Sequence, residues 1–306
     1  MKKVNKMLSI DDFQPITLKD KPVFDKHYEK YPTTHSDNVF TTLISWMEYA
    51  GYHFAFLDDN LLIYSAINNQ IRFRPPSGKF KKEIFVQVLN LAKKQDSDYP
   101  FGVVDLKTKE WMSKIYPKIE FKEHRDYYDY VYLSEDLAEL KGSSYSKIRN
   151  RLNKFKKNNV YSVGKISEEN MKEVREFLKR WCLWKDCESD PILENERKAI
   201  LYSISNFFDL KLSGILIRIN DAIESIAVFE GMNSDTALVH YEKGSPDYDG
   251  IYKAINQETA KLLQPNYKFI NRESDMGIPG LRKAKLSYKP HHMAKVFHVD
   301  RQGLSF

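Results

Sequence analysis

The chain has 306 residues, of which 42% are hydrophobic and 13% aromatic, and its formal net charge is +6. This apolar content excludes a disordered chain, and the length favours two domains of roughly 150 residues over one small core. No apolar run approaches the ~20 residues of a membrane-spanning helix, and residues 1–6 lead into no signal peptide. The modest net charge does not by itself indicate nucleic acid or an anionic membrane as a partner.

The chain contains two cysteines, Cys182 and Cys187. Two are too few for a disulfide framework, so we expect both to remain thiols in a reducing compartment. Together with the lack of a leader or membrane span, this favours a cytoplasmic protein. Zinc usually takes four ligands at tighter spacing, and the neighbouring His291 and His292 would face opposite sides of a strand. We therefore predict no metal site.

In the first half of the chain, helical and strand patterns alternate. Asp37 is a favourable N-cap residue for the first helix, and Asp58-Asp59-Asn60 joins two short strands as a hairpin. The expected elements are, in order, a helix over 39–49, strands over 53–57 and 61–66, a helix near 84–92, a strand over 101–106, a short helix over 107–115 and a strand over 127–133.

The second half repeats this order of elements. It predicts helices over 168–184 and 196–208, a hairpin of strands 212–219 and 223–230, a strand over 237–241, a helix over 252–263, a strand over 267–271, a short helix near 281 and a strand near 293–299. We therefore predict an α/β fold made of two copies of one unit. Because Gly142-Ser143-Ser144 interrupts the pattern, we predict domains at 1–138 and 139–306.

A strongly basic helix over 144–157 begins the predicted second domain. Its apolar residues are spaced as a helical stripe, and three cations gather on the opposite face, namely Lys147, Arg151 and Lys154. The amides of the preceding Gly-Ser-Ser and these cations suit a phosphate or carboxylate, so we expect this helix to hold an anionic donor. A charged face of this kind is also typical of a solvated surface helix.

Three stretches resemble a known family: 145–155, 244–252 and, most clearly, 277–290, which reads GIPGLRKAKLSYKP. They resemble the phosphatidylglycerol lysyltransferase C-terminal domain family, and the last stretch also resembles the end of Fem-type peptidoglycan aminoacyltransferases. The resemblance implies two tandem GNAT-like domains, each with a mixed, mostly antiparallel sheet flanked by helices. It also implies transfer of an aminoacyl group from aminoacyl-tRNA to an amine or hydroxyl.

Acyl transfer needs a group that takes the proton of the acceptor. His240 and Glu242 are two apart on a predicted strand, so we expect them to share one face as an acid and base pair. Glu273 and Asp275 follow the next strand and are candidates for the same role, since α/β sheets tend to bind ligands beyond strand ends. Each of these residues could instead make a structural hydrogen bond or cap a helix.

Further basic residues lie near the end of the chain. We predict that Arg282 and Lys285, three apart on a helix, join the cations of the 144–157 helix in binding the donor. Asn271 and Tyr288 are predicted to bind the acceptor, which could be a small molecule, a peptide or a lipid. No tightly bound cofactor is expected. A coenzyme A thioester or aminoacyl-tRNA would serve as co-substrate, which makes tRNA a candidate partner.

The sequence thus leaves two functions open. The first is an acyl or aminoacyl transferase that uses the residues named above. The second is a non-catalytic GNAT-like module that binds a nucleotide or an RNA end through the same basic residues. Substitution of His240 or Glu242 would stop the first function and leave the second unchanged.

Overall fold

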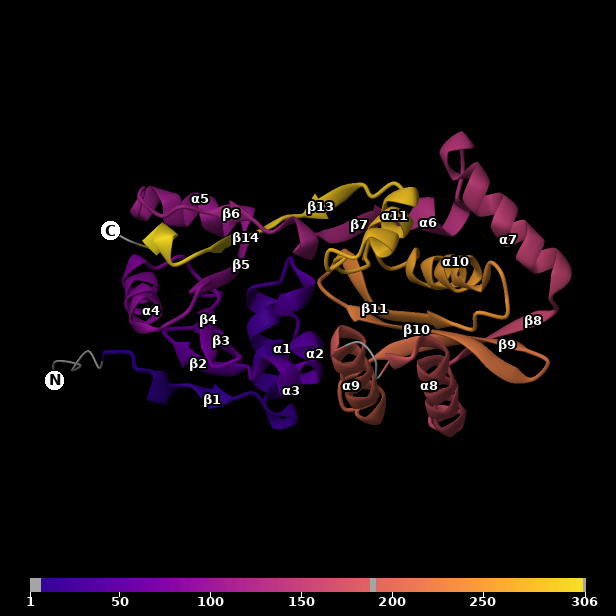
Figure 1. Ribbon diagram of the computed structural model, residues 1–306, viewed down its shortest axis with the longest axis horizontal. Helices are drawn as coiled ribbons and strands as arrows, with labels where there is room; N and C mark the ends of the chain where they lie inside the picture. Colours follow the sequence, from indigo (N-terminus) through magenta and orange to yellow (C-terminus); the bar gives the residue numbers. More distant parts are fainter. Residues whose placement is uncertain (1–6, 188–190, 305–306) are drawn as a thin grey trace. The chain divides into compact units, whose positions relative to one another are not determined.

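The computed structural model describes residues 7–187 and 191–304, and the segment in which a signal peptide was sought, 1–6, lies outside them. Two compact units are present (Figure 1). Unit 1 comprises Met1–Tyr128 and Ala294–Phe306, and unit 2 comprises Asp129–Met293. None of the helices in the described part of the chain has the length and apolarity that crossing a membrane requires.

Unit 1 contains one mostly antiparallel sheet with the strand order β1-β2-β3-β4-β5-β14-β6. The strands are β1 (Gln14–Pro15), β2 (His53–Leu57), β3 (Asn60–Ile67), β4 (Gln70–Phe73), β5 (Phe101–Asp105), β6 (Lys122–Glu123) and β14 (Val296–Val299). The helices are α1 (Lys21–Lys30), α2 (Phe40–Ser45), α3 (Met47–Ala50), α4 (Lys82–Lys94) and α5 (Leu106–Ile115). The helix expected over 39–49 is therefore two shorter helices, which meet at Trp46.

Unit 2 is built around a second sheet with the order β13-β7-β12-β11-β10-β9-β8. Its strands are β7 (Asp129–Leu133), β8 (Tyr161–Lys165), β9 (Ser213–Ile219), β10 (Ala222–Gly231), β11 (Thr236–Gly244), β12 (Phe269–Asn271) and β13 (His292–Ala294). Its helices are α6 (Ser134–Glu139), α7 (Ser146–Asn158), α8 (Met171–Lys185), α9 (Pro191–Ser205), α10 (Ile251–Leu263) and α11 (Pro279–Ser287). Helices α8 and α9 cover one face of the sheet, and α10 covers the other (Figure 1).

Both units contain the predicted hairpin. In unit 1 the turn residues Asp58 and Asp59 have φ of 46° and 62°, and in unit 2 Asn220 and Asp221 have φ of 50° and 64°. Two successive residues with positive φ form a turn whose twist matches that of paired strands, and Asn and Asp tolerate this conformation. The short polar turns in the sequence are thus sufficient to place both hairpins.

The two compact units divide the chain differently from the predicted domains 1–138 and 139–306. β7 pairs with β12 of unit 2, where Tyr132 lies opposite Ile270, and α6 packs on α10. In the other direction, β14 pairs with β5 of unit 1, where Phe297 lies opposite Val104. The difference arises because these segments pair with strands distant in sequence, which a local pattern does not reveal.

Candidate active site

A β-bulge at His240 determines which side chains of β11 meet. Val228 of β10 pairs with Tyr241, whereas the next residue, Phe229, pairs with Val239, so His240 is the extra residue. Phe229 and Val239 face the core under α10, and the ring of His240 binds Glu230, on the opposite face. Glu242 instead faces α10. The prediction that His240 and Glu242 share one face is therefore wrong, because a bulge interrupts the alternation.

The His240 ring is buried between two carboxylates. Its Nε2 is 2.8 Å from Glu230 Oε1, and its Nδ1 is 2.9 Å from Glu273 Oε1. Burial alone would lower the pKa of this ring, but the hydrogen bonds to Glu230 and Glu273 raise it to about 9. Burial also raises the pKa of Glu273, while the adjacent imidazolium lowers it. At neutral pH the ring donates both of its N–H groups, so it has no lone pair with which to accept a proton.

The loop after β12 holds Asp275 in a second buried network. Asp275 is fully buried, accepts a hydrogen bond of 2.5 Å from Tyr130 Oη, and pairs with both guanidinium branches of Arg282 at 2.8 and 2.9 Å. Although burial acts to raise its pKa, the hydrogen bonds from Arg282 and Tyr130 lower it to about 2. Asp275 therefore stays ionised and fixes α11 to the sheet. Its partner Arg282 is correspondingly engaged by a carboxylate within the protein.

Lys285 lies inside unit 2, with 8% of its surface exposed. Its Nζ donates to three main-chain carbonyls, those of Arg272, Glu273 and Ser274, at 2.5, 3.1 and 2.6 Å. Burial and the charge of Arg272 lower the pKa of Lys285 to about 8, so the ammonium form still predominates at neutral pH. This lysine holds the loop in shape, including Glu273, which has a left-handed φ of 55°.

Arg272, Glu242 and Asn256 form a third polar group, on the face covered by α10. Arg272 Nη2 donates to Glu242 Oε2, and Asn256 Nδ2 donates to Glu242 Oε1 at 3.0 Å. The guanidinium also lies 5.0 Å from the centroid of the Tyr288 ring. Lys253, in the first turn of α10, places its Nζ 4.6 Å from the same centroid. Sequence reasoning missed Lys253, Asn256 and Arg272. The sequence feature that could have revealed this group is Asn256, a polar residue within the apolar stripe of α10.

The two predicted acceptor residues are both buried. The Asn271 side chain donates to Asp129 Oδ2 at 2.8 Å and accepts from the backbone N–H of Glu273 at 2.8 Å, so both of its polar groups are used internally. Tyr288 lies beneath the two cations Arg272 and Lys253. Tyr288 thus belongs to the Glu242 group, whereas Asn271 supports the loop that precedes it.

The three predicted cations of α7 are exposed to solvent. Arg151 Nε lies 2.6 Å and Lys154 Nζ 3.6 Å from Asp249, which precedes α10, and Lys147 makes no ion pair with a described residue. The expectation that these cations and those of α11 meet at one ligand stays a prediction. Arg282 and Lys285 bind groups of unit 2 itself, whereas the α7 cations line an outer face beside the start of α10.

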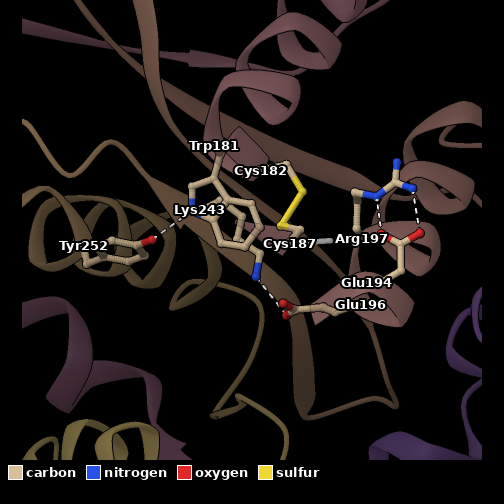
Figure 2. The surroundings of a disulfide bond; sticks show 8 residues. All are labelled: Trp181, Cys182, Cys187, Glu194, Glu196, Arg197, Lys243 and Tyr252. Atoms are coloured by element: carbon tan, nitrogen blue, oxygen red, sulfur yellow. Dashed lines mark hydrogen bonds and ion pairs between the residues drawn. A yellow bond between two sulfur atoms is a disulfide. The ribbon is translucent and has the colours of Figure 1, made fainter. Parts of the chain in front are cut away.

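The two cysteines form a disulfide, which corrects the prediction that both are thiols (Figure 2). Helix α8 ends at Lys185, and Asp186 adopts a left-handed conformation with φ of 50° that turns the chain back. This turn brings the Cα atoms of Cys182 and Cys187 to 5.3 Å, a usual separation for a disulfide. A pocket of about 310 Å³ lies beside the disulfide, between α8 and α9. In this neighbourhood Lys243 pairs with Glu196 at 2.8 Å.

In the part of the chain that the structure describes, no cluster of three or more His, Cys, Asp or Glu side chains could hold a metal ion. The polar groups of unit 2 are instead organised as ion pairs around the loop 272–275. Arg72 and Arg74 of unit 1 lie against the rings of Tyr99 and Tyr52.

The architecture agrees with the predicted class, a pair of GNAT-like α/β domains. Residues 28–299 match the family described as "Phosphatidylglycerol lysyltransferase, C-terminal", and the chain belongs to this family. The predicted fold class and family are thus confirmed. The match covers most of the chain, so the family assignment applies to both units.

Solved structures with the same fold include a conserved protein of unknown function from Bacteroides thetaiotaomicron. It is 32% identical, with a TM-score of 0.88 over 94% of this chain and 98% of that one. The C-terminal domain of a putative lysylphosphatidylglycerol synthetase from Agrobacterium fabrum is 12% identical, with a TM-score of 0.66 over 94% of each chain. At this identity the second likeness shows the fold alone.

An uncharacterized protein of Mycoplasmoides gallisepticum, MYCGA3080, is 27% identical over 181 residues. The matched region is 58% of this chain and 57% of that protein, so the chain spans little more than half of this relative. Family and fold together point to a transferase of acyl or aminoacyl groups. They do not name its donor or acceptor.

Proposed function

We propose that the protein is an aminoacyltransferase that takes an aminoacyl group from aminoacyl-tRNA and passes it to an amine or hydroxyl. The observation that carries the proposal is the exposed cationic face of α7, Lys147, Arg151 and Lys154, next to the start of α10. Membership of a lysyltransferase family supports the same chemistry.

The form of this face favours a long polyanion over a compact one such as coenzyme A. Lys147 and Lys154 are seven residues apart, which is ~10 Å along a helix, so the cations can contact more than one phosphate of a nucleic acid strand. Lys157 extends the positive charge to the last turn of α7. A row of exposed cations suits the open surface of an RNA stem.

The ion pairs with Asp249 do not oppose this role. The side chains of Arg151, Lys154 and Asp249 are 59%, 66% and 46% exposed, so their interactions are screened by water. Exposed ion pairs of this kind contribute about 0–1 kcal/mol, and a phosphate can replace the carboxylate at little cost. Asp249 keeps the cations extended toward α10 in the absence of the donor.

For the acceptor, we propose a chemical class. A nucleophilic amine or hydroxyl is the common feature of small-molecule, peptide and lipid acceptors, and the family name directs the first assay to phosphatidylglycerol. Transfer of a radiolabelled aminoacyl group from a mixture of aminoacyl-tRNAs to vesicles of phosphatidylglycerol, to peptides and to free amines tests the three classes side by side.

A triple variant tests whether the cationic face of α7, hereafter the donor surface, binds tRNA. Lys147→Glu, Arg151→Glu and Lys154→Glu together should lower tRNA affinity and reduce the dependence of log K on log salt by about two to three, because one contact contributes about 0.7–0.9 to the slope. Lys79→Glu, Lys93→Glu and Lys94→Glu, which are exposed in unit 1, change the net charge equally and serve as the control. Equal losses in the two triple variants would contradict the proposal.

One observation favours the alternative of a non-catalytic module. His240 donates both ring N–H groups to carboxylates and therefore lacks the lone pair of a base. The alternative predicts tRNA binding without transfer to any acceptor. Transfer in the assay above would exclude it.

A further inference from the structure

We propose that Arg272, Asn256 and Lys253 form a subsite for the α-aminoacyl group of the donor, in which Lys253 accepts the proton of the attacking acceptor. This proposal rests on the aminoacyltransferase function proposed above. It assigns the reaction centre to the face of the sheet covered by α10, away from His240. It also distinguishes an aminoacyl donor from a simple acyl donor.

Two buried polar atoms at this position have no hydrogen-bond partner among the described residues: Arg272 Nη1, which is a donor, and Asn256 Oδ1, which is an acceptor. Arg272 Nη2 and Asn256 Nδ2 donate to the carboxylate of Glu242, one to each oxygen. The unmet donor and the unmet acceptor therefore flank one carboxylate. Buried polar groups are usually satisfied, so this pair indicates a ligand with a complementary acceptor and donor.

An α-aminoacyl ester provides that complement. Its carbonyl oxygen can accept a hydrogen bond from Arg272 Nη1, and its α-ammonium group, on the adjacent carbon, can donate to Asn256 Oδ1. The Glu242 carboxylate beside them adds a negative charge that favours the ammonium group. An acetyl group has the carbonyl but no donor, and would leave Asn256 Oδ1 unsatisfied. The pair of unmet groups thus favours an aminoacyl over an acetyl donor.

Lys253 is more exposed than Asn256. It is half-buried, and its Nζ and the Arg272 guanidinium contact the same Tyr288 ring. Burial lowers the pKa of Lys253 to about 8, and the charges of Arg272 and Arg151 act in the same direction while Glu242 opposes them. A large fraction of neutral amine is therefore present just above neutral pH, as a general base requires. The phenols of Tyr288 and Tyr132 also pack against Arg272, and burial raises the pKa of both.

The same electrostatic coupling connects the subsite to the donor surface. Arg151 belongs to the cationic face of α7, yet it is close enough to lower the pKa of Lys253. Phosphates held at Arg151 and Lys154 would therefore lie near the first turn of α10. The aminoacyl end of the same RNA could reach Arg272 and Asn256 from there.

The reaction at this subsite balances as an acyl exchange. The acceptor oxygen or nitrogen forms a bond to the ester carbonyl carbon, and its proton moves to Lys253 Nζ. Arg272 Nη1 stabilises the charge that develops on the carbonyl oxygen. The ester C–O bond to the RNA then breaks, and Lys253 returns the proton to the leaving ribose oxygen. Ester and acceptor thus yield aminoacylated acceptor and free RNA hydroxyl.

A binding experiment on the whole protein tests the recognition of the α-amine. Alanine methyl ester and methyl propanoate differ in the amino group, and ligand-observed NMR titration gives the Kd of each. We expect alanine methyl ester to bind at least about tenfold more tightly, the effect of one charge-assisted hydrogen bond. Asn256→Leu should abolish this preference. Equal affinities in the unchanged protein, or a preference that survives Asn256→Leu, would overturn the subsite.

A kinetic experiment tests Lys253. Lys253→Met keeps the aliphatic stem and should lower the transfer rate by about 10²–10⁴, the usual contribution of a general base. In the unchanged protein the rate should rise with pH to a plateau, with a midpoint near pH 8. Lys253→Met should remove this rise. Lys261→Met, in the last turn of the same helix and paired with Glu258, is the matched control and should leave the rate and profile unchanged.

The two proposals fail in different ways. If the unchanged protein transfers aminoacyl groups and Lys253→Met does so equally fast with the same pH profile, the subsite is wrong and the function stands. If the unchanged protein transfers none from any aminoacyl-tRNA, the function is wrong. Circular dichroism and thermal unfolding confirm that each variant is folded, and Lys253→Arg, which keeps a cation that does not release its proton, should lower the rate as Lys253→Met does.

Discussion

Each unit contains a histidine that is at least partly buried, and the pKa values of these two residues are shifted in opposite directions. In unit 1, burial and the nearby His298 and Arg72 lower the pKa of His124 to about 4, so the ring is neutral. In unit 2, two carboxylates outweigh burial and raise the pKa of His240 to about 9, so the ring is charged. Burial favours the neutral ring in both cases. The charge of each ring is therefore decided by the groups next to it, which are two carboxylates in the case of His240.

The largest expected effect comes from removal of the charged ring. His240→Leu leaves the partly buried carboxylates of Glu230 and Glu273 without their cation and should destabilise unit 2 by about 3–5 kcal/mol. His124→Leu removes a neutral ring that packs on Tyr127 and should cost about 1 kcal/mol in unit 1. The comparison is wrong if the two substitutions destabilise their units equally.

Tryptophan fluorescence measures the two units separately during urea unfolding. The chain has four tryptophans: Trp46 and Trp111 lie in unit 1, and Trp181 and Trp184 lie in unit 2. Replacement of either pair by phenylalanine leaves a probe in the other unit alone. This separation matters because a chain of two units need not unfold in a single step.

The pH dependence of stability should differ between the units. His240 has a folded pKa above its unfolded value of about 6.5, so its contribution is complete below pH 6.5 and is lost as pH rises through 9, a change of about 3 kcal/mol. His124 has a folded pKa below that value, so its contribution is complete above pH 6.5 and is lost as pH falls toward 4. Unfolding curves between pH 4 and 10 should show unit 1 weakening in acid and unit 2 in base. Parallel curves for the two units would contradict this account.

A reductant should have a smaller effect on unit 2 than the loss of the His240 charge. Both cysteines lie in unit 2, where their disulfide closes a short loop, so reduction should destabilise unit 2 by about 2 kcal/mol and leave unit 1 unchanged. Unfolding with and without dithiothreitol measures the effect. The double variant Cys182→Ser and Cys187→Ser should unfold like the reduced protein and should not respond to dithiothreitol.

Much of the fold follows from local patterns in the sequence. The turns at Asp58-Asp59 and Asn220-Asp221 contain residues that tolerate positive φ, so both hairpins were predictable. The basic helix was equally clear, because Ile148, Leu152 and Phe155 mark its buried stripe and thereby its exposed face. These features depend on residues within one turn or one helix.

The candidate site was less predictable because it depends on distant neighbours. Lys285 resembles any surface lysine in the sequence, yet carbonyls from the loop after β12 surround its ammonium group. The bulge at His240 has no sequence signature and reverses which residues share a face with Glu242. Lys253 becomes a candidate base through its burial and through the charges of Arg272 and Arg151, which are far from it in sequence.

Strand pairing also dictates where the chain can be cut. In the sheet of unit 2, β7 lies between β13 and β12, so a fragment that starts at residue 139 would lack an inner strand. The exposed edge of β12 would then be free to pair with other molecules, and such a fragment should aggregate. A fragment of residues 129–294 retains every strand of that sheet and is the shorter piece to express for crystallisation or NMR.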